Sequence, residues 1–159
     1  MIILGIDPGI GRCGWGVIEV EGLKLKVLNY GCIETSSKKE VAQRLKEVHE
    51  EIVGLIKKYS PVALGIEELF FNTNAKTAFV VGQARGVILL AAAESKIPVS
   101  IYTPLQVKIA VTGYGRAEKE QVGKMVKTIL KLKDIPKPDD TTDALAIAIT
   151  HAFSVKMKF

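Results

Sequence analysis

The sequence has 159 residues, of which 48% are hydrophobic, 22 are Lys or Arg and 17 are Asp or Glu, giving a formal net charge of +5. This length suffices for one domain with a buried core, and only two cysteines exclude a disulfide-rich fold and favour a reducing compartment. The N-terminal residues do not resemble a secretory signal, and the longest apolar stretch, residues 87–93, is too short to span a bilayer. We therefore expect a cytoplasmic protein without a membrane partner, whose positive charge favours polyanions such as nucleic acid.

The predicted elements follow one another without a linker or an internal repeat. Three strands come first, at residues 1–6, 14–20 and 24–35, and Glu21-Gly22 joins the last two as a hairpin. The later elements are a helix at 39–59, a strand at 62–66, a helix at 74–94, a strand at 98–102 and helices at 105–111, 118–132 and 139–153. This order predicts a mixed α/β sheet, in which right-handed crossovers place the fourth strand beside the first.

Four carboxylates stand where these apolar elements end or begin. Asp7 follows the first strand, Glu67 follows the fourth strand, and Asp140 and Asp143 open the last helix one turn apart. A glycine lies two residues before each strand acid, on the same face of its strand, and leaves room there for the last helix. We expect the four acids to meet above this face of the sheet.

Oxygen-only ligands suit Mg²⁺ or Mn²⁺ rather than zinc or copper. An acidic metal cluster in a basic protein predicts a metal-dependent nuclease, because the positive surface would hold phosphates. Each acid also has a simpler interpretation: Asp140 could be a helix N-cap with Asp143 as its capping-box partner, and Asp7 could be a turn residue. Glu67 is harder to explain in this way, because a buried strand should not end in an acid without a partner.

Five segments of the sequence match a known family pattern in order. They are Gly5-Ile6-Asp7-Pro8-Gly9, Gly65-Ile66-Glu67, Gly82-Gln83-Ala84-Arg85-Gly86, Ala117-Glu118-Lys119 and Asp140-Thr141-Thr142-Asp143-Ala144-Leu145-Ala146-Ile147-Ala148. Together they resemble the RuvC family of bacterial Holliday junction resolvases, from Ile2 to about His151. Thr141 and Thr142 are more polar than the alanines expected of that family, and we interpret them as helix-start residues.

The resemblance implies a ribonuclease H-like α/β fold, with a mixed five-stranded sheet of order 3-2-1-4-5 that is flanked by helices and has strand 2 antiparallel. It implies a single nuclease domain at residues 1–155 and a short basic tail at 156–159. The activity it implies is resolution of four-way DNA junctions by a homodimer, in homologous recombination and DNA repair. Paired symmetric nicks would leave 5′-phosphate and 3′-hydroxyl ends, with functional coupling to the branch-migration proteins RuvA and RuvB.

By the same resemblance, Asp7, Glu67, Asp140 and Asp143 are the catalytic, metal-binding acids. The cofactor expected is Mg²⁺, with Mn²⁺ also supporting activity, at one or two ions per subunit. Two such ions, about 3.5–4 Å apart, would activate water and stabilise the leaving oxygen, so no side-chain nucleophile is needed.

The DNA contacts expected are Phe70, Lys108, Arg116 and Lys119. Lys108 and Lys119 match family positions implicated in junction binding and catalysis, and Phe70 matches a position whose ring stacks on an unpaired base. Alternation along the chain also allows Phe70 or Phe71 to be a core residue. Arg116 and Lys119 flank the start of a helix, which favours phosphate. Three other lysines are interpreted as a solvated helix face: Lys124, Lys127 and Lys131.

The helix at 74–94 is apolar around most of its circumference, and Gly82 and Gly86 permit close approach of another helix. Such a helix is either fully buried or shared with a partner. A two-fold dimer would match the near two-fold symmetry of a four-way junction. His49 and His151 lack metal-ligand spacing and are expected to be structural.

Three other functions remain open. One is a ribonuclease H-like nuclease acting on RNA–DNA hybrids or nicked DNA. Another is a kinase-like ATPase, in which residues 5–9 form a phosphate loop, although 159 residues leave little room for a second lobe. The third is a junction-binding protein without catalytic activity.

Overall fold

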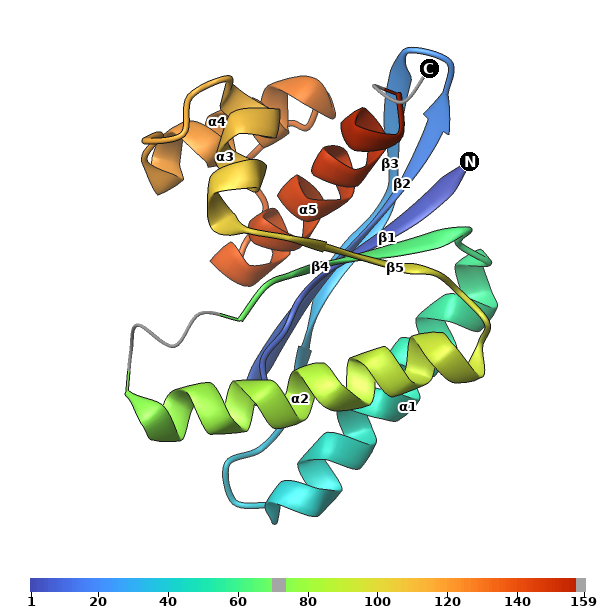
Figure 1. The fold of residues 1–159 in the computed structure, drawn as a ribbon, viewed down its shortest axis with the longest axis vertical. Helices are drawn as coiled ribbons and strands as arrows, with labels where there is room; N and C mark the ends of the chain where they lie inside the picture. Colours follow the sequence, from blue (N-terminus) through green and yellow to red (C-terminus); the bar gives the residue numbers. More distant parts are fainter. Residues whose placement is uncertain (70–73, 157–159) are drawn as a thin grey trace.

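Five strands form one mixed sheet in the computed structural model, which describes residues 1–69 and 74–156 (Figure 1). They are β1 (Ile2–Asp7), β2 (Arg12–Glu21), β3 (Lys24–Glu34), β4 (Ala63–Glu67) and β5 (Val99–Tyr102). The order is β3-β2-β1-β4-β5, with β2 antiparallel to both its neighbours and β4 parallel to both β1 and β5. The strand order expected from the sequence is confirmed.

The helices cover both faces of this sheet. They are α1 (Val41–Tyr59), α2 (Ala75–Glu94), α3 (Pro104–Thr112), α4 (Lys119–Ile129) and α5 (Asp139–Lys156). Figure 1 shows α1 and α2 on one side of the sheet and α3, α4 and α5 on the other. The fold is therefore a three-layer α/β arrangement, and the layer that contains α5 also contains the expected acids.

Alternation along β1 divides the core between the two faces. Ile3 belongs to the core under α5, whereas Leu4 and Ile6 belong to the core shared with α1 and α2. All three side chains are fully buried. Asp7 continues the alternation begun by Ile3 and so points to the α5 face.

Helix α5 lies unusually close to the sheet because glycines line its path. A Cβ atom built on Gly5 would lie 2.2 Å from the carbonyl oxygen of Ala144, and one on Gly14 would lie 1.9 Å from that of Asp140. A side chain at either position would therefore push α5 away. The expectation that glycine makes room for the last helix holds for β1, and the same is true of β2.

Several helix ends differ from the sequence expectation by one to three residues, and α5 runs to Lys156 rather than to residue 153. Two of the differences have a clear cause in the backbone. Helix α4 ends at Ile129 rather than at residue 132, because Lys131 adopts a positive φ of 53° and the Leu132 amide donates back to the Lys127 carbonyl at 2.9 Å. Helix α1 begins at Val41 rather than at 39, because Glu40 is still extended. Composition alone does not locate these changes of backbone direction.

Helix α2 is long and apolar enough, by length and composition alone, to cross a membrane. The sequence expectation considered only the uninterrupted apolar run within it and missed this. The criterion is weak, because a core helix of the same composition also meets it. The cytoplasmic location stays a prediction.

Candidate active site

Parallel pairing of β1 with β4 brings Asp7 and Glu67 together. Ile6 pairs with Ile66, and each acid is the next residue of its strand. The carboxyl ends of adjacent parallel strands lie at the same edge of a sheet, so the two side chains open onto one site. Both residues are partly buried.

The first turn of α5 supplies the other two acids. Asp140 is the second residue of the helix rather than the residue preceding it, so its interpretation as an N-cap is wrong. Two buried threonines anchor this turn: the Thr141 hydroxyl donates to the Gly31 carbonyl at 3.2 Å, and the Thr142 hydroxyl to the Pro136 carbonyl at 2.7 Å. These contacts agree with a structural role for both threonines.

The acids influence one another electrostatically. Burial raises the pKa of Asp7 from 3.8 to about 8, and the charges of Asp143, Glu67 and Asp140 add to the rise. Burial and then Asp143 raise the pKa of Glu67, and burial is also the main reason why the pKa of Asp143 is raised. The raised pKa values show that nearby positive charges do not fully compensate the negative charge of these acids.

Two basic side chains approach these acids. The Nζ atom of Lys119 lies 3.3 Å from a carboxylate oxygen of Asp143 and 3.3 Å from one of Asp139. Partial burial acts to lower the pKa of Lys119, but these two acids outweigh it and raise the pKa. On the other side, Arg12 lies 3.5 Å from Asp140. The helix-flanking position of Lys119 was foreseen, whereas the part played by Arg12 was not.

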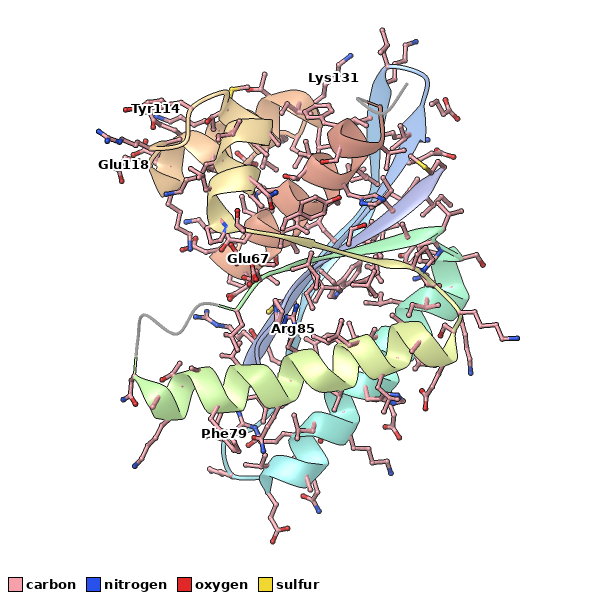
Figure 2. All side chains as sticks on the ribbon, in the orientation of Figure 1. Glu67, Phe79, Arg85, Tyr114, Glu118 and Lys131 are labelled. Carbon is pink, nitrogen blue, oxygen red and sulfur yellow. The ribbon has the colours of Figure 1, made fainter. Side chains whose placement is uncertain are left out.

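Two grooves meet at Glu67. One, of about 330 Å³, is lined by Glu67 and Asp143 together with Lys108 and Lys119. The other, of about 220 Å³, is lined by Asp7, Glu67 and Arg85. Figure 2 shows Glu67 at the end of its strand, between α5 above and α2 below. Acids at the centre and bases along the grooves suit a polyanion that must come close to a cation.

The donor chemistry of the four acids fits a hard divalent cation, because all the ligands are carboxylate oxygens and their charge is under-compensated. Within residues 1–69 and 74–156, no three His, Cys, Asp or Glu side chains are arranged as a metal site. Asp140 and Asp143 are paired instead with Arg12 and Lys119. The assignment of the acids as metal ligands stays a prediction.

One expected DNA contact, Arg116, is not brought to this site. Arg116 is exposed in the loop between α3 and α4, and it does not line either groove. Phe70 lies outside the described residues. The histidines are engaged elsewhere: His151 contacts the Tyr102 hydroxyl at 2.7 Å, and His49 contacts Glu94 at 2.8 Å.

Sequence reasoning missed two bases at the site, Arg12 and Arg85. Arg12 opens β2, and only the pairing of β2 with β1 and the docking of α5 place it beside Asp140. Arg85 belongs to the glycine-flanked motif of α2 that the sequence analysis identified. It could not be assigned to the site, because the sequence does not show which face of that helix packs on the sheet.

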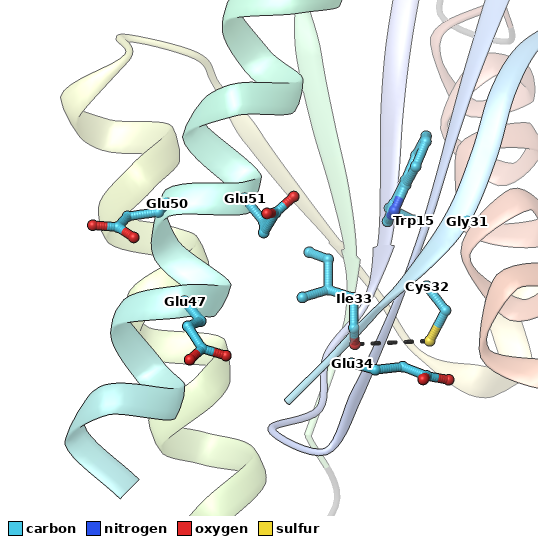
Figure 3. Close-up of a pocket in the computed structure, with 8 residues that line it drawn as sticks. All are labelled: Trp15, Gly31, Cys32, Ile33, Glu34, Glu47, Glu50 and Glu51. Carbon is cyan, nitrogen blue, oxygen red and sulfur yellow. Dashed lines mark hydrogen bonds between the residues drawn. The ribbon is translucent and has the colours of Figure 1, made fainter. Parts of the chain in front are cut away.

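A separate cavity of about 490 Å³ lies between β3 and α1 (Figure 3). Four glutamates line it together with Trp15 and Cys32, and these acids are Glu34, Glu47, Glu50 and Glu51. Burial raises the pKa of the Cys32 thiol, and both cysteines of the chain are free. This acidic surface would repel phosphate, and it shares no residue with the two grooves at Glu67.

The order of the sheet, with acids at the ends of β1 and β4 and at the start of α5, defines the ribonuclease H-like class of nucleases. The chain belongs to the RuvC family: the model of the crossover junction endodeoxyribonuclease RuvC matches residues 3–151.

Individual relatives are similar to this chain in sequence or structure over nearly its full length. The crossover junction endodeoxyribonuclease RuvC of Alkaliphilus metalliredigens is 58% identical over 154 residues, which cover 97% of this chain and 94% of the relative. The structure of Thermus thermophilus RuvC superposes with a TM-score of 0.93 at 42% identity, covering 99% of this chain and 97% of the other. A second T. thermophilus RuvC structure, in complex with a Holliday junction substrate, gives a TM-score of 0.95 at 42% identity, covering 99% and 96%.

Proposed function

We propose that this protein is an endodeoxyribonuclease that resolves four-way DNA junctions. The observation that carries the proposal is the under-compensated acid cluster flanked by two groove lysines, in a chain of the RuvC family. The T. thermophilus relative was captured with a Holliday junction substrate, which supports the same class of DNA for this chain. A kinase-like ATPase is not supported, since the family match spans nearly the whole chain.

The cluster would hold one or two divalent cations, with Mg²⁺ as the proposed ion and Mn²⁺ as a substitute. Asp7, Glu67, Asp140 and Asp143 are the residues that would hold them. When bound, such ions activate water and stabilise a leaving oxygen. Lys119 and Arg12 pair with two of these acids. If the acids bind a cation instead, both bases would become available to bind phosphate.

Lys108 and Lys119 would hold the backbone of the cut strand. Both line the groove that contains Glu67 and Asp143, and ammonium groups bind phosphate as point charges without reading sequence. Selectivity for the junction would then come from its shape rather than from base contacts. Arg116, exposed in the loop before α4, would contact a neighbouring part of the backbone.

We further propose that the protein acts as a homodimer through α2. Phe79 is 68% exposed and Leu90 is 51% exposed, and a Cβ atom at Gly86 would meet no atom within 4 Å. Figure 2 shows Phe79 on the side of α2 opposite to Arg85, away from the sheet. A two-fold dimer would place two sites on two opposite strands of a junction and produce paired symmetric nicks. Coupling to RuvA and RuvB remains an inference from the family.

A comparison of substrates tests this function. A synthetic junction with a mobile crossover, a linear duplex of the same sequence and an RNA–DNA hybrid are incubated with the protein and Mg²⁺. We expect cleavage of the junction at the crossover and little cleavage of the other two. Equal or faster cleavage of the hybrid would instead support the alternative ribonuclease H-like activity.

A further inference from the structure

Arg85 is a base whose position is explained neither by the fold nor by the acid cluster. It extends from the sheet-facing side of α2, below Glu67 in Figure 2. Its Nε atom is buried and, of the buried side-chain nitrogen and oxygen atoms in the described chain, it alone has no hydrogen-bond partner. Buried polar atoms normally have a partner in the protein or in a bound molecule. An orphan donor of this kind indicates a partner that residues 1–69 and 74–156 do not supply.

The surroundings of Arg85 leave its charge available. Asp7, Glu67 and Glu68 line the same groove of about 220 Å³, yet within residues 1–69 and 74–156 Arg85 forms no ion pair with any of them. The pKa of Glu67 responds to burial, Asp143 and Lys119, and Arg85 is not among these influences. The guanidinium is therefore close to the acids without being neutralised by them.

The groove of Arg85 continues the groove of the lysines. The two share Glu67 and Pro104, so the acids lie between Lys108 and Lys119 on one side and Arg85 on the other. A DNA strand whose scissile phosphate lies at the acids would pass from one groove into the other. The acids repel the adjoining phosphates of that strand, and a fixed cation on the α2 side would offset the repulsion.

We propose that Arg85 binds the phosphate adjacent to the scissile phosphate on the strand being cut, an inference that rests on the proposed junction cleavage. The guanidinium is a planar fork that matches two phosphate oxygens, and its buried Nε is the donor that fixes the direction of the fork. A lysine could supply the charge but not this geometry. Arg85 is thus a substrate-contacting residue that holds the strand in register over the acids.

Single-turnover cleavage of a mobile junction at saturating protein tests the contact. Arg85→Gln should slow cleavage by about 10- to 100-fold, the effect of losing one charged hydrogen-bonding contact. Arg85→Lys should fall between Arg85→Gln and the parent. Lys57→Gln, which removes one positive charge from the exposed end of α1, should cleave at the parental rate. Melting curves establish that each variant is folded.

A modified substrate tests the same contact without changing the protein. A neutral methylphosphonate replaces the phosphate on one side, and then on the other side, of the scissile position. We expect one of these replacements to slow the parent by a factor similar to that of Arg85→Gln, and to slow Arg85→Gln hardly further. If both proteins are slowed equally at both positions, Arg85 does not contact either phosphate and the inference is wrong.

Binding provides a readout that is independent of catalysis. In a Glu67→Gln background, which leaves the junction uncut, adding Arg85→Gln should reduce the slope of log affinity against log salt by about one phosphate contact. An unchanged slope would contradict the inference. If the parent cleaves junctions but Arg85→Gln does so at the same rate, only the role of Arg85 fails; if the parent does not cleave junctions at all, the proposed function fails with it.

Discussion

At the scale of single residues, the site is defined by partly buried carboxylates whose negative charge the nearby bases do not fully compensate. Asp7, Glu67 and Asp143 all have raised pKa values, with burial as the first cause in each case. The sequence predicted which acids would meet, because each stands at the end of an apolar element. It did not predict their pairing with Arg12 and Lys119, because those contacts depend on side chains brought in by strand pairing and helix docking.

Asp7→Asn should stabilise the metal-free protein in a pH-dependent way. The pKa of Asp7 is about 8 in the folded protein and near 3.8 in an unfolded chain, so the folded state holds a proton that the unfolded state has lost between these values. The parent should lose stability as the pH rises from about 4 to about 8, and the Asn variant should lose less. Near pH 8, we expect its melting temperature to exceed that of the parent by at least about 2–4 °C, the shift produced by about 1 kcal/mol.

Melting curves from pH 4 to pH 9 without divalent metal, repeated with Mg²⁺, test this prediction. Mg²⁺ should stabilise the parent more than Asp7→Asn, since it binds the folded site. A variant that melts below the parent at every pH and gains equally from Mg²⁺ would identify Asp7 as a structural turn residue.

Glu67→Gln should separate cleavage from binding. The substitution preserves shape but removes a proposed metal ligand, so cleavage should fall below detection. Junction affinity should change by less than about threefold, because Lys108, Lys119 and Arg85 would supply the phosphate contacts. Gel-shift titration beside a cleavage assay measures both quantities, and a loss of affinity as large as the loss of cleavage would reject this division of roles.

At the scale of elements, the position of α5 decides where two of the four acids lie. The succession of strands and helices along the chain could be predicted because apolar periodicity changes clearly between segments, whereas the full order of strands in the sheet was implied by the family resemblance. The closeness of α5 was foreseen from glycine beside Asp7, but the contact of Gly14 with Asp140 depends on β2 lying beside β1. The ends of α1 and α4 could not be predicted because single backbone angles, as at Lys131, decide them.

Gly14→Ala should therefore destabilise the protein and disturb the site. Its Cβ atom would lie 1.9 Å from the Asp140 carbonyl oxygen, a backbone atom that can yield only if α5 moves. We expect a loss of about 1–3 kcal/mol in the free energy of unfolding, the usual effect of overpacking, together with slower junction cleavage.

Gly54→Ala is the matched control. A Cβ atom at Gly54, within α1, would meet no atom within 4 Å, so alanine should raise stability by about 0.4–1 kcal/mol. Urea unfolding of both variants measures the contrast. Equal stabilities of the two variants would show that the packing of α5 on the sheet does not require glycine at position 14.

At the scale of the whole molecule, an apolar helix remains partly uncovered. Helix α2 packs on α1, yet Phe79 and Leu90 stay exposed. The sequence could show that α2 is apolar all round, but it could not show which side would be left open. The fold described here superposes closely on that of T. thermophilus RuvC over nearly the full length of both chains.

Leu90→Glu should weaken the proposed homodimer. A charge on the open face of α2 would be buried without a partner on association, and we expect the dimer dissociation constant to rise by at least tenfold. Leu23→Glu is the control, because Leu23 is 92% exposed in the β2–β3 hairpin, far from α2. Sedimentation velocity across a dilution series compares them. Equal dimerisation of both variants and the parent would exclude α2 as the interface.

The most direct measurement maps the nicks on a mobile four-way junction. The junction is labelled at the 5′ end of each strand in turn and incubated with Mg²⁺ and either the parent or Glu67→Gln, and the products are then treated with DNA ligase. We predict that the parent makes symmetric nicks in two opposite strands, that ligase seals them, and that Glu67→Gln makes none. Equal cleavage by Glu67→Gln, or parental nicks that are confined to one strand or cannot be ligated, would contradict this prediction.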